Sequence, residues 1–133
     1  MTNIKLFTLT ATILILLMML LAGSFYYKTE MELTPVITAV SPNGEAEMTI
    51  YQVGEPAWPF GPTDCRFDLR NGNKRVIKYS FSIHNDGAPA FENNFTISWH
   101  DDHVQVMVSA EEQFDVNYYL FYDGTVEESM ELW

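Results

Sequence analysis

The chain begins with 22 consecutive residues without a charge, from Leu6 to Tyr27, flanked by Lys5 and Lys28. An α-helix rises about 1.5 Å per residue, so roughly 20 apolar residues cross a hydrocarbon core of about 30 Å. The aromatic residues that end the run suit the headgroup layer of a bilayer. The run therefore predicts one membrane-spanning helix over residues 6–27, in direct contact with membrane lipid.

The charges that flank this helix set its expected orientation. Lys5 and the α-amine precede the helix and Lys28 follows it, so the bias is small, but a short positive leader favours a cytoplasmic N-terminus. We therefore expect a single-pass protein of the cytoplasmic membrane. Its leader covers residues 1–5, residues 28–35 form a polar tether, and residues 36–133 lie outside as an extracytoplasmic β-domain.

Two cleavable alternatives share the same N-terminal pattern. A signal peptide has a positive start, an apolar stretch and small residues at its exit, which Ala22 and Ser24 supply for cleavage after Ser24. The segment Leu21-Ala22-Gly23-Ser24 also resembles the bacterial lipobox, in which a cysteine stands where this chain has Ser24. A serine hydroxyl cannot form the lipid thioether, and the apolar run is long for a signal peptide. The sequence therefore favours a retained anchor.

Beyond residue 35 the apolar residues alternate with a period close to two, and no amphipathic helix of useful length is found. Turn residues interrupt this pattern at short intervals. The pattern predicts an all-β fold: an antiparallel meander, sandwich or small barrel of about six to seven strands, preceded by the N-terminal helix. The expected strands cover residues 36–40, 47–53, 65–70, 75–84, 95–100, 103–109 and 114–122.

Three turn motifs and the alternation together predict which side chains form the core. The turns are Ser41-Pro42-Asn43-Gly44, Asn71-Gly72-Asn73-Lys74 and Asp101-Asp102, which combine residue types that favour tight turns. A shift of one residue would turn each strand over, so the alternation is a strict prediction. The expected core positions are Phe67, Leu69, Ile77, Tyr79, Phe81, Ile83, Phe95, Ile97, Trp99, Val104, Val106, Val108, Phe114, Val116, Tyr118 and Leu120.

The single cysteine and the net charge exclude several classes of protein. Cys65 cannot form an internal disulfide, and its alternation with Phe67 and Leu69 predicts a buried strand position. The formal net charge of −11 argues against nucleic acid and against anionic lipid headgroups as partners. It suits a soluble face outside an anionic membrane, or a cationic partner.

The turn and strand motifs of the β region resemble a group of known proteins. Ser41-Pro42-Asn43-Gly44, the segment from Ile97 to Val106 and Glu111-Glu112-Gln113 are similar to small membrane-anchored or lipoprotein-like β-domain proteins of Gram-positive bacteria. The resemblance covers most of residues 40–122 and implies a β-domain outside the cell membrane. Because that family has no assigned function, it implies no catalytic residue. Ser24 departs from the lipobox with which the family often begins.

A proline-rich loop is the first candidate contact surface. The loop from Glu55 to Pro62 contains three prolines and presents Trp58 and Phe60 outside any expected strand. Rigid aromatic side chains bind at low entropic cost, for example to a sugar ring or a peptide side chain. The alternative, favoured because large exposed aromatic residues are unusual without a partner, is that the two rings cap the open end of the core.

A basic hairpin is the second candidate surface in an otherwise acidic domain. Arg66, Arg70 and Lys78 lie on the two strands that flank the Asn71–Lys74 turn. They would meet an anionic wall polymer, lipid headgroups or an acidic protein. The alternative is that they neutralise carboxylates within the domain and protect a sheet edge.

One turn carries residue types that bind metals. His100, Asp102 and His103 lie around a single expected hairpin turn, with His84 as a further nitrogen ligand, and such groups bind Zn²⁺ or Mn²⁺. A solvated turn explains the same residues and is favoured. The sequence has no Gly-x-Ser-x-Gly elbow and no glycine-rich phosphate loop, so no catalytic residue and no cofactor are predicted.

The leading interpretation is therefore a non-enzymatic interaction module at the cell surface, with an unknown protein or cell-wall partner. A small metal-binding protein or metal-dependent hydrolase that uses His84, His100 and His103 is one alternative. An acidic immunity-like protein that blocks a cationic partner is another.

Overall fold

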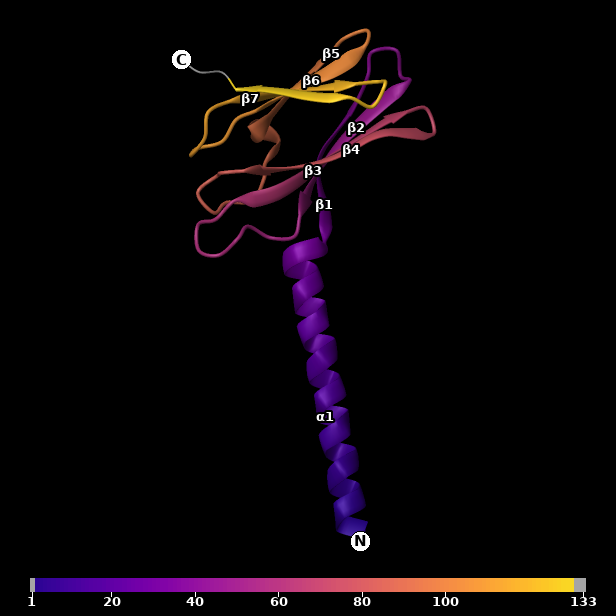
Figure 1. The fold of residues 1–133 in the computed structure, drawn as a ribbon, viewed down its shortest axis with the longest axis vertical. Helices are drawn as coiled ribbons and strands as arrows, with labels where there is room; N and C mark the ends of the chain where they lie inside the picture. Colours follow the sequence, from indigo (N-terminus) through magenta and orange to yellow (C-terminus); the bar gives the residue numbers. More distant parts are fainter. Residues whose placement is uncertain (1, 131–133) are drawn as a thin grey trace.

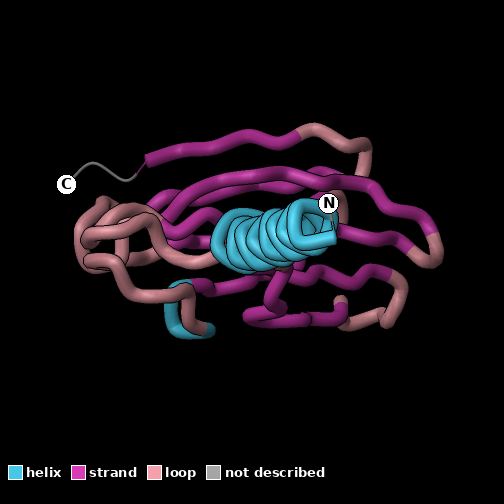
Figure 2. Tube along the Cα trace, turned by 90° about the horizontal axis from the view of Figure 1, so that it is seen from below, coloured by secondary structure: helices cyan, strands magenta, loops and turns pink. Residues whose placement is uncertain are grey.

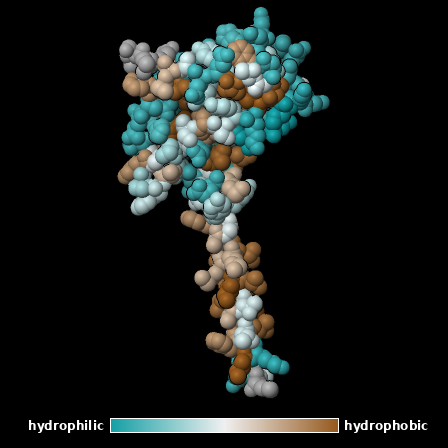
Figure 3. Space-filling model, in the orientation of Figure 1, coloured by the Kyte–Doolittle hydropathy of each residue, from teal (hydrophilic) through white to brown (hydrophobic). Residues whose placement is uncertain are grey.

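A computed structural model describes residues 2–130 and begins with one long helix. Helix α1 (Thr2–Tyr26) continues into a single π-helical turn, η1 (Tyr27–Met31), and together they are long and apolar enough to cross a bilayer. A signal sequence shares this length and composition. None of the side chains of α1 is buried against the rest of the chain (Figure 1). Its surface is apolar along most of its length, whereas the β region is largely hydrophilic (Figure 3).

The hydroxyls of the threonines near the start of α1 donate hydrogen bonds within the helix. The Oγ1 atom of Thr8 donates to the carbonyl of Lys5 at 2.9 Å, and that of Thr12 donates to the carbonyl of Thr8 at 2.8 Å. Thr10 bonds in the same way to the preceding turn. These polar side chains therefore remain compatible with an apolar surrounding.

Eight strands form two antiparallel four-stranded sheets, each a simple meander. The first sheet has the order β1-β2-β3-β4 and the second the order β5-β6-β7-β8. A short 3-10 helix, η2 (Glu92–Asn94), precedes the second sheet. Viewed along the helix, the strands extend across its axis (Figure 2). The strands are β1 (Leu33–Val40), β2 (Ala46–Val53), β3 (Thr63–Asn71), β4 (Lys74–Ile83), β5 (Phe95–Trp99), β6 (His103–Val108), β7 (Val116–Phe121) and β8 (Val126–Met130).

The prediction of a mostly antiparallel β fold behind one apolar helix is confirmed, and its details need two corrections. Residues 2–130 form eight strands rather than the expected six or seven, and the additional strand is β8. The expected polar tether over residues 28–35 is helix as far as Met31 and strand from Leu33, so only Glu32 separates the two elements. Met1 of the expected leader and residues 131–133 of the expected β-domain lie outside the described residues.

Both sheets contribute to one hydrophobic core. Phe67 on β3 stacks on Phe81 of β4 with the ring centroids 4.1 Å apart, and it meets Tyr118 of β7 edge-on at 5.2 Å. Phe81 also meets Phe95 of β5 edge-on at 6.1 Å. Buried aliphatic side chains from both sheets complete this core, and Cys65 is buried within it as predicted.

One expected core residue lies at the surface. Phe114 is 52% exposed because β7 begins only at Val116, which leaves Phe114 in the link between β6 and β7. Tyr79, Ile97 and Trp99 are partly buried and pack on the edge of the core. The remaining expected positions are buried, except Val116, which is also partly buried against the core.

The three expected turns are confirmed. Gly72 takes the first central position of the β3–β4 turn with φ +63°, and Asn71 pairs with Lys74 across it. Positive φ at this position is what a type II′ hairpin turn requires, and glycine adopts it without a steric penalty. The β1–β2 turn closes with a bond from the Gly44 amide to the Ser41 carbonyl, and the β5–β6 turn with one from His100 to His103.

Candidate functional site

The proline-rich loop between β2 and β3 presents its two aromatic side chains to the surroundings. Trp58 is 92% exposed and Phe60 is 76% exposed. The alternative in which these rings cap the core is therefore wrong for this structure. Two large exposed rings that only Pro59 separates in the chain are typical of a contact surface.

The tip of this loop is held in a fixed shape. The amide of Gly61 donates to the carbonyl of Ala57 at 2.7 Å, and the amide of Ala57 donates to the carbonyl of Pro62 at 3.0 Å. Phe60 has φ +59°, a conformation that bulky residues rarely adopt and that costs of order 1–3 kcal/mol. Such an outlier persists only where the surrounding structure enforces it, so the loop presents Trp58 and Phe60 in one defined arrangement.

The root of the loop is bonded to the end of the apolar helix. The amide of Glu55 donates to the carbonyl of Thr29, and the amide of Gly54 donates to the carbonyl of Glu32, both at 2.7 Å. Gly54 has φ +68°, and a Cβ atom at this position would overlap the carbonyl oxygen of Thr29. The close approach of backbone to backbone therefore requires glycine at position 54. We call these four residues the helix–loop junction.

A buried glutamine supports the junction from the other side. Gln52 on β2 donates through Nε2 to the carbonyl of Gly54 at 2.9 Å and accepts from the amide of Ala90 at 2.8 Å. The Cα atom of Phe60 also lies against Gly87, where an added Cβ would approach it to 2.7 Å. Gln52 cannot be identified from the sequence alone, because one amide side chain in a strand carries no distinctive pattern.

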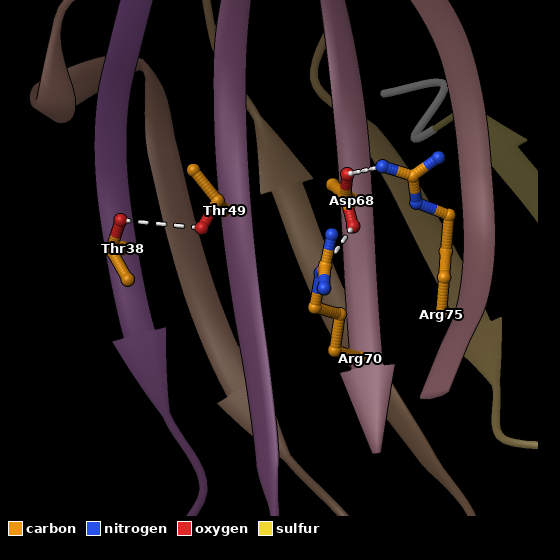
Figure 4. Close-up of polar contacts among 5 residues, drawn as sticks. All are labelled: Thr38, Thr49, Asp68, Arg70 and Arg75. Atoms are coloured by element: carbon orange, nitrogen blue, oxygen red, sulfur yellow. Dashed lines mark hydrogen bonds and ion pairs between the residues drawn. The ribbon is translucent and has the colours of Figure 1, made fainter. Parts of the chain in front are cut away.

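The residues of the basic hairpin interact largely within the domain. Asp68 is only 5% exposed, and its carboxylate lies 3.0 Å from Arg75 and 3.6 Å from Arg70 (Figure 4). The guanidinium of Arg66 lies over the ring of Tyr51 at 5.4 Å. The arrangement favours internal neutralisation over a free cationic surface.

Lys78, the third residue of the basic hairpin, lies in one cross-strand row with Asp68, Thr49 and Thr38. It is exposed and stands opposite Asp68 in the pairing of β3 with β4. In the same row, the hydroxyls of Thr38 and Thr49 lie 3.3 Å apart (Figure 4). The predicted binding role of Arg66, Arg70 and Lys78 stays a prediction.

The β5–β6 turn brings part of the expected histidine cluster together. The rings of His100 and His103 stack with their centroids 4.4 Å apart, and Nδ1 of His103 lies 2.6 Å from a carboxylate oxygen of Asp102. The hydrogen bond with His103 lowers the pKa of the exposed Asp102 carboxyl. The turn thus forms a local polar cluster at the surface.

The cluster does not form a metal site with His84. That residue follows β4, whereas the β5–β6 turn lies next to Asn71 beside the start of β4. A strand of ten residues spans about 30 Å, so the two places are at opposite ends of the domain. Within residues 2–130, no group of three or more His, Cys, Asp or Glu side chains is placed to hold a metal ion.

A polar hollow of about 310 Å³ lies at the end of the domain that carries the histidine turn. It is lined by the β1–β2 turn, Asn71, Trp99, His100, Asp101 and Tyr122. In Figure 1 this end lies far from the helix. We call it the distal end, in contrast to the end at which the aromatic loop meets the helix.

Buried ionisable groups in the core predict a loss of stability at alkaline pH. Burial raises the pKa of the Cys65 thiol from 9.0 to about 12, and the charge of Asp64 adds to this. Burial, followed by the charge of Glu128, raises the pKa of Tyr118 from 10.0 to about 12. For each group, at a pH between its ordinary pKa and its raised pKa, the unfolded state releases a proton that the folded state retains. The free energy of unfolding is therefore unaffected by these groups below pH 9 and decreases as the pH rises towards 12.

Denaturant titrations at increasing pH measure this loss. The Cys65→Ala variant should show a smaller decrease in the free energy of unfolding between pH 9 and pH 11 than the unaltered chain, because it lacks the buried thiol. Equal slopes for the two proteins would contradict the assignment.

No protein-family model matches this chain, and neither a curated protein nor a solved structure matches it. The resemblance to small β-domain proteins of Gram-positive bacteria therefore stays a prediction, which rests on the turn and strand motifs alone.

Proposed function

We propose that the chain is a single-pass protein of the cytoplasmic membrane whose β region forms a β-sandwich outside the membrane and acts as a non-enzymatic interaction module. The observation that carries this proposal is the exposure of Trp58 and Phe60 on a loop bonded to the end of the apolar helix. A fixed aromatic pair loses little conformational entropy on binding, so its burial contributes to affinity.

The orientation rests on the charges around the helix and on the acidity of the β region. Lys5 and the α-amine favour a cytoplasmic N-terminus, and every acidic residue follows the helix core, after residue 29. A strongly acidic domain is repelled by the anionic inner leaflet. These arguments favour a β region on the outer side, where it meets proteins or cell-wall components.

The remaining polar features support a binding role more than a catalytic one. Cys65 is buried and protonated, so it is no nucleophile, and the described histidines and carboxylates are not gathered into a metal-binding group. Among the described residues, the polar side chains that line the distal hollow include those of Ser41, Asn71 and His100. They lack the nucleophile and base pairing that acyl or phosphoryl transfer needs.

Cross-linking on intact cells tests this proposal. A membrane-impermeant, amine-reactive reagent added outside should link the exposed lysines of the β3–β4 hairpin to neighbouring molecules, which purification of the full-length chain then recovers. The double variant Trp58→Ala/Phe60→Ala should reduce the yield of linked complexes while the melting temperature stays the same, because both rings are exposed.

The matched control changes exposed residues at the distal end. His100→Ala/Asp101→Ala should leave the yield of linked complexes unchanged. If the reagent reaches the β region only in broken cells, the proposed orientation is wrong. If the loop variant keeps its complexes but melts at a lower temperature, the loop is part of the core rather than a contact.

A further inference from the structure

We infer that the partner of the aromatic loop is the bilayer that its own helix spans: Trp58 and Phe60 insert into the interfacial layer and fix the β region on the membrane surface. This inference rests on the proposed membrane-spanning role of α1. On this inference the Trp58→Ala/Phe60→Ala variant reduces the yield of linked complexes because it releases the β region from its fixed position on the membrane, not because it removes a protein contact. It assigns a lipid contact to a segment that begins 28 residues after Tyr27, the last residue of the uncharged run, and the chain is then attached to the membrane at two points.

The position of the loop along the helix carries the argument. Tyr26 and Tyr27 mark the end of the uncharged run, and the headgroup layer extends about 5–8 Å beyond the hydrocarbon core. Thr29, to which Glu55 is bonded, lies two residues later, or about 3 Å along the axis. The root of the loop is therefore within the headgroup layer when the helix spans the bilayer.

The direction of the loop agrees with this position. In Figure 1 the loop between β2 and β3 is drawn in magenta. It lies below the first sheet, at the level of the upper end of the helix. The view from the N-terminal side shows loops on one flank of the helix, with no part of the β region between them and the viewer (Figure 2). The backbone of this loop is thus on the side of the domain that faces a bilayer.

The chemistry of the loop suits an interface rather than a protein groove. Tryptophan favours the headgroup region, where its apolar ring is shielded and its indole N–H finds polar partners. Phe60 adds a ring without polar atoms. Phe25, Tyr26 and Tyr27 on the helix are also exposed, so the two segments present aromatic rings around one level of the membrane.

Charge does not drive this contact. Glu32 and Glu55 belong to the helix–loop junction, Glu30 follows Thr29 in the chain, and Lys28 is the basic residue of the last helical turn. An excess of carboxylates gives no attraction to anionic lipids. Insertion must therefore come from the apolar rings, and it should occur equally on uncharged zwitterionic vesicles and at high salt.

Tryptophan fluorescence of the full-length chain in phosphatidylcholine vesicles with brominated acyl chains tests the inference. In a Trp99→Phe/Trp133→Phe background, Trp58 should emit at shorter wavelength than a water-exposed indole and lose intensity to the bromine atoms. The reciprocal Trp58→Phe/Trp133→Phe chain reports Trp99 near the distal end, which should not be quenched. Adding Gly54→Ala to the Trp58 reporter should reduce its quenching, because the substitution displaces the loop from the helix.

A third reporter separates failure of this inference from failure of the anchor. A Leu14→Trp chain in which Trp58, Trp99 and Trp133 are phenylalanine should be quenched if α1 spans the bilayer. Quenching at position 14 with an unquenched, water-exposed Trp58 would overturn the lipid contact and leave the proposed function with a different partner for the loop. An unquenched position 14 would overturn both, and equal quenching of Trp58 and Trp99 would show unspecific adsorption instead.

Discussion

The Phe67→Ala variant should lower the free energy of unfolding of the β region by about 3–5 kcal/mol, the range for removal of a fully buried phenylalanine. The side chain has no exposed surface. Its ring contacts Phe81 within the first sheet and Tyr118 across the interface between the sheets. Because it touches both sheets, its loss removes apolar burial and leaves a cavity where neither sheet closes in easily.

Denaturant unfolding of the full-length chain in detergent micelles measures this effect, and Phe114→Ala provides the matched control. Phe114 is the same residue type but lies at the surface, so its replacement should change stability by less than about 0.5 kcal/mol. A Phe67→Ala cost as small as that of the control would mean that the two sheets do not share this core.

The Gly54→Ala variant should separate the aromatic loop from the helix. Positive φ alone costs an alanine about 1–2 kcal/mol. The new Cβ also meets the Thr29 backbone, and steric conflicts of this kind cost about 1–3 kcal/mol. The junction should relax by breaking the bond from the Glu55 amide to Thr29, so hydrogen exchange at Glu55 should become faster while exchange in the core strands stays slow.

Gly72→Ala is the control for the cost of positive φ alone. Gly72 has a similar φ of +63°, but nothing lies within 4 Å of an added Cβ. This variant should lose only the cost of positive φ and should leave exchange at Glu55 unchanged. If the two variants lose equal stability and Glu55 keeps its protection in both, the close contact between loop and helix does not exist.

The alternation in the sequence was sufficient to predict most of the fold. Strands such as β3, in which Cys65, Phe67 and Leu69 alternate with polar residues, carry the pattern of a half-buried sheet. β8 lacks it: of its five residues only Val126 is partly buried, and the strand is held by backbone pairing to β7. An edge strand of this kind is hard to predict from the sequence, because backbone hydrogen bonds rather than buried side chains hold it in place.

The candidate site was predictable only in part, for a similar reason. Trp58 and Phe60 stand out because large aromatic residues in a proline-rich loop break the surrounding pattern. Their attachment to the helix joins Gly54 and Glu55 to Thr29 and Glu32 through main-chain groups, which every residue type possesses. The burial of Asp68 was not predictable either. The alternation of β3 places its side chain on the outward face, yet Asp68 is buried beside Arg70 and Arg75.

Only Glu32 separates the helix from β1, and in a chain anchored as proposed this short connection would make the β region sensitive to bilayer thickness. A helix whose apolar length exceeds the local hydrocarbon thickness tilts to keep its side chains in lipid. With a flexible tether that tilt would stop at the membrane surface. If α1 spans the bilayer as proposed, the helix–loop junction and the short connection transmit the tilt to the β region, and a thinner membrane would change the height of the distal end above the lipid. Bilayer composition would thus set how far the domain reaches.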